Sequence, residues 1–236
     1  SAEIITPKEE LNKTSRLGDV FMTIFSVFLA LGLFFVAPIG LTTWLFERDQ
    51  DAFMFNFISG VFRVIFFLTY LILISLIKDI RRLFQYHGAE HKTVYNFESG
   101  RKLSVENAQS FPTQHPRCGT SFLFIIMIVA ILSFAVLDAG MIHYVGELKV
   151  WMRLAYHIPF IPIVAGMGYE VLKFTARHRD NILCRILVKP GLWLQNITTK
   201  QPDDEQIEVA LKALKEAFGD DLEKYTGKTY VAEAIG

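Results

Sequence analysis

Two short motifs rich in His and Cys stand in the polar segment between two strongly hydrophobic stretches of the chain. The first is His87-Gly-Ala-Glu-His91, and the second is His115-Pro-Arg-Cys118. On a helix, His87 and His91 would share one face, with Glu90 beside His87. His-x-x-Glu-His is the spacing of inverted zincins, in which two His hold zinc and the Glu activates water. The first motif therefore predicts a zinc site.

A motif of five residues also occurs by chance, and histidines near a membrane surface often only form hydrogen bonds. The second motif strengthens the metal interpretation, because three imidazoles, a thiol and a carboxylate then lie within about thirty residues. We predict that His87, His91, His115 and Cys118 bind one divalent metal ion, with zinc as the expected ion.

The composition indicates a membrane protein. The chain has 236 residues, of which 52% are hydrophobic and 21 are Phe, and the apolar residues come in blocks. The net charge is zero, so nothing general points to nucleic acid. Two cysteines, Cys118 and Cys184, cannot form the disulfide framework of a small secreted domain, and Cys118 is expected to be a reduced thiol.

Four apolar runs are long enough to cross a bilayer, which needs roughly 20 residues. They cover Val20–Phe46, Phe53–Ile77, Ser121–Leu137 and Leu154–Phe174. The expected fold is therefore all-α, with four transmembrane helices. The third and fourth runs are shorter or more polar, and a buried hairpin is the alternative for them.

Two ionisable residues within these runs have two interpretations each. Arg63 either snorkels outward, which we expect, or faces partners inside the membrane. Glu170 either faces the metal site as a second catalytic acid, or reaches the interface and pairs with Lys173. We predict that Glu170 faces the site, because a carboxylate pointing at lipid costs roughly 1–3 kcal/mol.

The basic residues predict the orientation in the membrane. The connection after the second run and the tail after the fourth are rich in Lys and Arg, whereas residues 47–51 hold one Arg and three acids. Basic loops stay in the cytoplasm. We therefore expect a multi-pass protein of the cell membrane with both termini and the motif loop, residues 78–118, in the cytoplasm.

These expectations divide the chain into five segments. They are a cytoplasmic N-terminal segment (1–19), the first two transmembrane helices (20–77), the motif loop (78–118), the last two transmembrane helices (119–176) and a cytoplasmic tail (177–236). The second helix should continue through Arg81 and Arg82 into the His87 motif, and Ser104 should cap a short helix. The tail should hold an interfacial segment at 191–198 and an amphipathic helix from Asp203 to Phe218.

Several motifs in order resemble the YqhQ-like family of bacterial integral membrane proteins. They are Phe84-Gln-Tyr-His-Gly-Ala-Glu-His-Lys92, Leu103-Ser-Val-Glu-Asn107, His115-Pro-Arg-Cys-Gly119, Pro190-Gly-Leu-Trp-Leu-Gln195 and Thr198-Thr-Lys-Gln-Pro-Asp-Asp-Glu-Gln206. The resemblance covers roughly residues 20–218. It implies a membrane location and a metal-dependent enzyme, but no substrate, because the family is of unknown function.

The chain departs from this family at its beginning. Family members usually carry a glycine-rich cytoplasmic segment before the first membrane helix, whereas this chain begins at Ser1 without one. Either this segment is a separate polypeptide, which would then complete the site, or it was removed, for example by cleavage. The expected partners are the lipid bilayer and a separate N-terminal fragment or other membrane proteins.

Three functions compete on these residues. In a metal-dependent membrane hydrolase, such as a peptidase, Glu90 would be the general base and Glu170 a further acid. In a scaffold or assembly factor, His87, His91, His115 and Cys118 would close a structural zinc site. The number of protein ligands discriminates the two, because a catalytic zinc keeps three and an open position. A transporter is disfavoured because we expect the four runs to have few interior polar groups.

Overall fold

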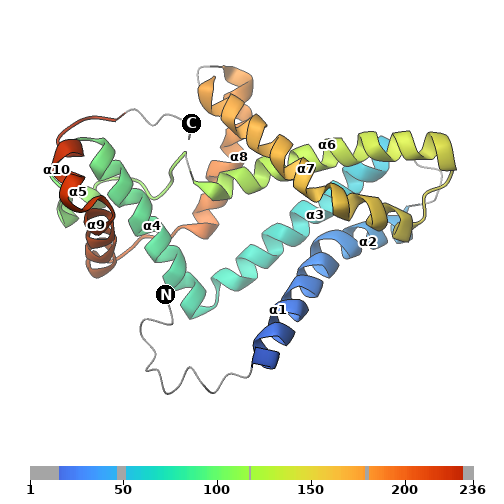
Figure 1. Cartoon of the computed structure of the whole chain (residues 1–236), viewed down its shortest axis with the longest axis horizontal. Coiled ribbons are helices and arrows are strands. Elements are labelled where there is room, and N and C mark those ends of the chain that lie inside the picture. Colours follow the sequence, from blue (N-terminus) through green and yellow to red (C-terminus); the bar gives the residue numbers. More distant parts are fainter. Residues whose placement is uncertain (1–15, 47–51, 117, 179–180, 231–236) are drawn as a thin grey trace.

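All regular structure in the described part of the chain is helical (Figure 1). The computed structural model describes residues 16–46, 52–116, 118–178 and 181–230. Most of the predicted N-terminal segment, the acidic connection 47–51 and Arg117 lie outside these ranges. The expectation of an all-α fold is confirmed.

Four helical stretches are long and apolar enough to cross a membrane. They are Gly18–Leu45, Ala52–Ser75, Phe122–Val145 and Val150–Thr175. The first comprises α1 (Arg16–Leu31), the π-helical turn η2 (Gly32–Val36) and α2 (Ala37–Leu45), and the others belong to α3 (Ala52–Ser75), α6 (Gly119–Val145) and α7 (Val150–Arg177). Their number supports a multi-pass membrane protein. The third helix extends beyond the predicted end at Leu137, because nothing breaks the helix before Gly146.

The second membrane helix does not continue into the motif loop, and that prediction is wrong. α3 ends at Ser75, Ile77 takes an extended conformation, and a separate helix α4 (Lys78–Glu98) begins at the first charged residue. The two helices meet at an angle in Figure 1. The chain therefore leaves the apolar span and starts a new helix that runs in a different direction from α3.

The helices form two groups with separate apolar cores. α6 contacts α3 and α7, and this bundle buries Ile125, Val129, Phe134 and Val164. The second group contains α4, α5 (Val105–Gln109) and α9 (Asp204–Phe218), whose buried residues are Ala89, Ala108, Ile207 and Leu211. Figure 1 shows the two groups at opposite ends of the molecule, with α10 (Leu222–Tyr225) in the second group. We call the second group the peripheral group. The long axis of the molecule runs from the bundle to this group.

The tail begins with α8 (Ile182–Thr198), which is longer than the predicted interfacial segment and runs through Pro190. It contacts α6, α3 and α7. The amphipathic helix α9 begins as predicted, because Asp203 and Gln206 form a reciprocal capping box, and it ends at Gly219. Its apolar stripe packs on α4 and α5. Likewise, the Ser104 side chain caps α5, accepting from the backbone N–H of Asn107.

Arg63 lies inside the bundle, so the prediction of an outward-snorkelling side chain is wrong. Its guanidinium stands over the rings of Phe35 and Phe134, and its Nε and Nη2 atoms are buried. The spans also bury Asp138, Arg153 and His157. The spans therefore do contain interior polar groups. The argument against a transporter assumed that they have few, and it does not hold.

Candidate metal site

α4 presents His87 and His91 on one face, one turn apart, and the N-terminus of α6 brings Cys118 to them. The three residues offer ligand atoms that all lie within 4.8 Å of one another. His87 Nε2 is 3.2 Å from Cys118 Sγ. In a tetrahedral zinc site with ordinary Zn–N and Zn–S bonds, these two atoms would be about 3.5 Å apart. The three side chains are thus already spaced to bind one ion.

Hydrogen bonds orient both imidazoles for metal binding. His87 Nδ1 lies 2.9 Å from the carbonyl oxygen of Thr198, and His91 Nδ1 contacts the carbonyl oxygen of Thr113. A carbonyl can only accept, so each Nδ1 carries the proton and donates it. In the neutral ring, the lone pair is then on Nε2, which is the nitrogen that His87 directs at Cys118. This second hydrogen bond is typical of metal-bound histidines.

Cys118 is prepared to bind a cation as a thiolate. Burial raises the pKa of its thiol, but hydrogen bonds from His87, His91 and Thr120 outweigh this and lower the pKa to about 5. Cys118 also caps the N-terminus of α6, where the helix dipole favours negative charge. The hydrogen bond to Cys118 in turn raises the pKa of His87, against the effect of burial. A thiolate facing an imidazolium is therefore the expected state without metal.

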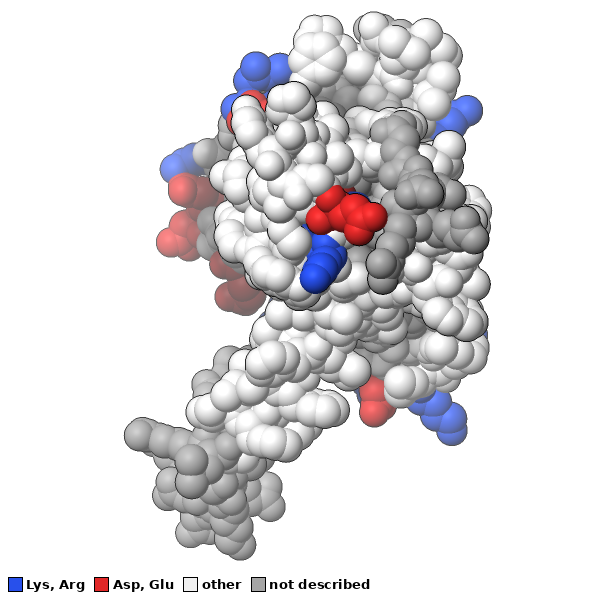
Figure 2. All heavy atoms as spheres, turned by 90° about the vertical axis from the view of Figure 1, so that its right-hand side faces the viewer, with Lys and Arg blue, Asp and Glu red and all other residues white. Residues whose placement is uncertain are grey.

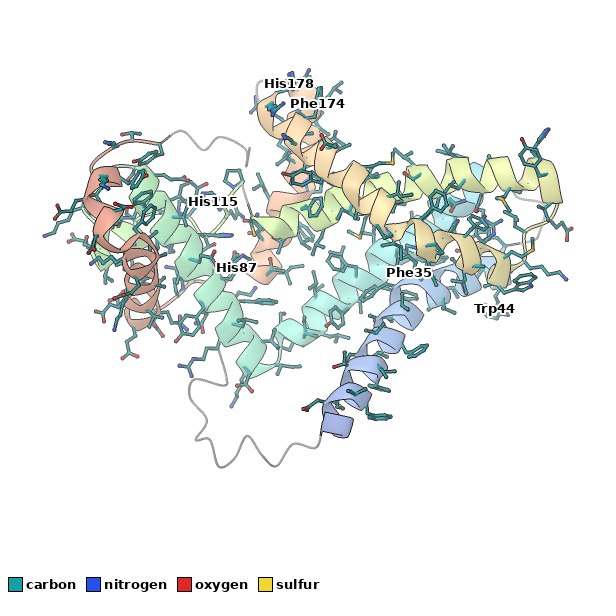
Figure 3. The ribbon with its side chains drawn as sticks, in the orientation of Figure 1. Phe35, Trp44, His87, His115, Phe174 and His178 are labelled. Atoms are coloured by element: carbon teal, nitrogen blue, oxygen red, sulfur yellow. The ribbon has the colours of Figure 1, made fainter. Side chains whose placement is uncertain are left out.

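His115 is near these residues but directed differently. Its Nε2 lies 3.4 Å from Glu98 Oε2, in a buried pair, and its ring stands 5.6 Å from that of His91 between centroids. His115 is not among the residues whose ligand atoms converge. In Figure 3, His87 and His115 both lie between α4 and the beginning of α6. The structure thus brings three of the four predicted ligands together and gives the fourth a carboxylate partner.

The segment that carries His115 is held by side chains from two other elements. The Gln195 amide of α8 pairs with the His115 backbone: the N–H of His115 donates to Oε1 at 2.7 Å, and Nε2 donates to its carbonyl at 2.9 Å. From α4, the buried Lys92 ammonium donates to the carbonyls of Gln109 and Phe111. Desolvation lowers the pKa of Lys92. The approach to Cys118 is therefore fixed from both sides.

Gly88, between the two α4 ligands, allows another segment to cross the helix closely. The backbone N–H of Lys200 donates to the carbonyl of Phe84 at 2.8 Å. A Cβ atom at position 88 would stand 2.1 Å from the carbonyl oxygen of Lys200. Glycine weakens a helix by about 1 kcal/mol. Here it lets residues 198–200 lie against α4, which places the Thr198 carbonyl on His87.

The two predicted catalytic acids lie in exposed positions. Glu90 is exposed on α4 and close enough to His87 to act on it electrostatically. Glu170 is exposed on α7, outside the group of converging donors. In Figure 3, Phe174 and His178 mark the end of α7, well apart from His87. The catalytic roles of Glu90 and Glu170 stay predictions.

Glu98 and the two backbone carbonyls were missed by the sequence analysis. Glu98 could have been found, because His87, His91, Tyr95 and Glu98 follow one another at helical spacing on α4. The Tyr95 ring lies against the His115 ring at a tilt of 56°, with ring centroids 4.4 Å apart. The Thr198 and Thr113 carbonyls had no detectable signal, since any residue supplies a carbonyl.

Comparison with known proteins agrees with the resemblance found in the motifs. Residues 1–220 match the model of a family described as "Protein of unknown function (DUF1385)". The "Uncharacterized protein YqhQ" of Bacillus subtilis (strain 168) is 38% identical over 159 residues, which are 67% of this chain and 48% of that protein. The chain thus spans about half the length of this curated relative. No solved structure matches the chain. The chain belongs to the DUF1385 family of proteins of unknown function.

Proposed function

We propose that this protein is a zinc-dependent membrane hydrolase, of the peptidase class, acting at the cytoplasmic face of the membrane. The observation that carries the proposal is the convergence of His87, His91 and Cys118, with His115 paired to Glu98 instead. Three protein ligands leave one position of a tetrahedral site for water or substrate, as in catalytic zinc sites.

Some residues of α4 would bind the zinc ion, and another would transfer protons. A bound zinc would supply Lewis-acid polarisation and a lowered pKa for water. His87 and His91 hold the orientation of their rings through Thr198 and Thr113. The exposed Glu90 carboxylate, beside His87, would take the proton of the attacking water and deliver it to the leaving group. Glu170 would act as a further acid from α7, and Glu170→Gln should then slow hydrolysis while zinc is retained.

Metal content is the first test. The purified full chain is expected to bind about one zinc per molecule, and His91→Ala should lose most of it. His143→Ala is the matched control, since His143 is an exposed histidine at the far end of α6 and should leave the metal content unchanged. Equal metal content in wild type and His91→Ala would contradict the proposal.

Catalysis is tested with Glu90→Gln. This variant should retain zinc but lose hydrolysis of peptide substrates by about a hundredfold or more, in the range of a lost general base. If it retains both, Glu90 is not the base.

A scaffold with a structural zinc is the second candidate, favoured by the closeness of the His115 ring to that of His91. Rotation of His115 away from Glu98 would bring a fourth protein ligand to the ion. X-ray absorption on the zinc-loaded chain separates the two. One sulfur, two imidazoles and a light atom support the hydrolase, whereas one sulfur and three imidazoles support the scaffold.

A further inference from the structure

The membrane bundle contains a buried polar cluster that is separate from the His/Cys site. At its centre is Asp138 of α6, which is fully buried. One carboxylate oxygen accepts from Tyr156 and from His157 Nε2, and the other accepts from Asn56 Nδ2 at 2.7 Å and from Arg153. Each oxygen thus accepts two hydrogen bonds, which fills the usual capacity of an ionised carboxylate. Asp138 has no further lone pair to offer.

Arg63 is the second cation of this region, and two of its three guanidinium nitrogens have no hydrogen-bond partner among the described residues. It stands two turns along α3 from Asn56 and is the twelfth of the helix's 24 residues, near the middle of the span. Its guanidinium lies 5.3 Å from the Phe35 ring centroid and 5.5 Å from that of Phe134. Its Nε and Nη2 atoms are buried and have no acceptor among the described residues.

His157, which also packs on Phe134, carries a third unpartnered atom. The His157 ring stacks on Phe134, with centroids 4.1 Å apart, and its Nδ1 atom is buried without a hydrogen-bond partner among the described residues. Ser59, one turn before Arg63 on α3, likewise has a buried hydroxyl with no described partner. Unpartnered polar groups of this kind cost free energy, and several together at one level of the membrane indicate a ligand.

The charges around Phe134 do not balance. Arg63 and Arg153 contribute two positive charges, and Asp138 contributes one negative charge, so the group carries one excess positive charge. The other acids of the four spans, Asp19 and Glu170, are exposed. An uncompensated charge in the membrane interior is costly. Water could accept the hydrogen bonds of Arg63 but would leave this charge in place.

We propose that Arg63 binds a small monovalent anion, of the halide or formate class, inside the membrane bundle beside Phe35 and Phe134. A guanidinium donates to an anion through its Nε and Nη2 groups together, which are the two atoms left unpartnered here. A lipid phosphate does not fit, because Arg63 lies about 16 Å along the helix from Ala52, below the headgroup level.

The site is independent of the proposed metal centre. Figure 3 places Phe35, against which Arg63 lies, far from His87 and His115. Figure 2 views the molecule from the end that carries the connection between α6 and α7, where most of the described surface is uncharged, with a small group of charges near its centre. Arg63 itself lies inside the bundle, against the rings of Phe35 and Phe134.

Thermal unfolding of the full chain in detergent tests the proposal. At equal ionic strength, replacing sodium gluconate with sodium chloride should raise Tm saturably, by about 5 °C once chloride is near a hundred times its Kd. Arg63→Gln should abolish the chloride-dependent rise. Arg185→Gln removes an exposed arginine of α8 and should keep it.

Three results would overturn the proposal. They are equal Tm values of wild type in the two salts, a rise that does not saturate, and an undiminished rise in Arg63→Gln. If Arg63→Gln does not fold, Arg63→Lys keeps the charge but loses the paired donors, and a chloride response equal to that of wild type would then count against the site. Line broadening of ³⁵Cl in NMR, competed by formate, provides the direct measurement of binding.

Discussion

His87 Nε2 lies 3.2 Å from Cys118 Sγ, although 31 positions separate the two residues in the chain. One atom belongs to a long helix of the peripheral group and the other to the residue that caps the N-terminus of a membrane helix. The pair therefore joins the two groups of helices at the level where the chain enters the bundle. It also makes the electrostatics of each residue depend on the other.

The thiol of Cys118 should titrate far below an ordinary cysteine in metal-free protein. In a Cys184→Ser background, where Cys118 is the remaining cysteine, thiolate absorbance near 240 nm should appear with a midpoint at about pH 5. Because the pKa is lowered on folding from 9.0, the stabilisation from Cys118 is complete above pH 9, falls as the pH decreases, and is absent below about pH 5.

His87→Ala in the same background should move this midpoint upward by more than one pH unit, because the hydrogen bond from His87 is the largest influence that lowers the pKa. His178→Ala is the control, since His178 is exposed and its ring bonds to the carbonyl of Phe174 in its own helix. A midpoint that is the same in His87→Ala as in its parent would contradict the thiolate–imidazolium pair.

Gly88→Ala should weaken metal binding without removing any ligand. The new methyl group would overlap the Lys200 carbonyl, so residues 198–200 must move away from α4 and take the Thr198 carbonyl from His87. Loss of such a supporting contact typically lowers metal affinity 10–100-fold. Competition with a chromophoric chelator measures the change. Gly140→Ala, at a helical position with open space around it, should bind zinc as wild type does.

Asp138→Ala should strongly destabilise the bundle. Removing the carboxylate leaves Arg153 buried without its anion and removes the acceptor of Asn56 and His157, which costs about 3–5 kcal/mol for a broken buried pair. Unfolding of the detergent-solubilised chain measures the loss. Glu147→Ala, an exposed acid in the connection between α6 and α7, should change stability by less than about 0.5 kcal/mol.

The predicted orientation is tested by cysteine labelling in intact cells. Arg101→Cys, exposed in the motif loop, should be protected from an impermeant maleimide until the cells are opened, and Glu147→Cys should react from outside. The unaltered chain reports any background from Cys118 and Cys184. The reverse pattern would place the His/Cys site outside the cell and require a different substrate compartment.

The sequence predicts an element of the fold correctly where neighbouring residues alone determine it. The apolar runs marked the four spans, and the Asp203 and Ser104 caps marked the beginnings of α9 and α5. The break between α3 and α4 has no such signal, since Leu76 and Ile77 are apolar and neither Gly nor Pro interrupts the run. It depends on where the bundle ends and the peripheral group begins to pack.

The site could be predicted as a set of ligands but not as a geometry. The spacing of His87 and His91 was sufficient to place them on one face, and the His-x-x-Cys motif brought Cys118 to them. The sequence predicts His115 as a fourth ligand, because it does not reveal that Glu98 offers this histidine a buried carboxylate. Similarly, the sequence predicts that Arg63 snorkels outward. Its position along α3 does not reveal the aromatic rings that surround it inside the bundle.

The hydrogen bond between His87 and the Thr198 carbonyl has a consequence for biosynthesis. These two residues are 111 positions apart, and all of α6 and α7 lies between them. The ribosome therefore synthesises both histidines of α4 and the whole of α6 and α7 before the carbonyl that orients His87 exists. Metal acquisition is then a late event, and a nascent chain interrupted before α8 would expose its histidines without the geometry to retain an ion.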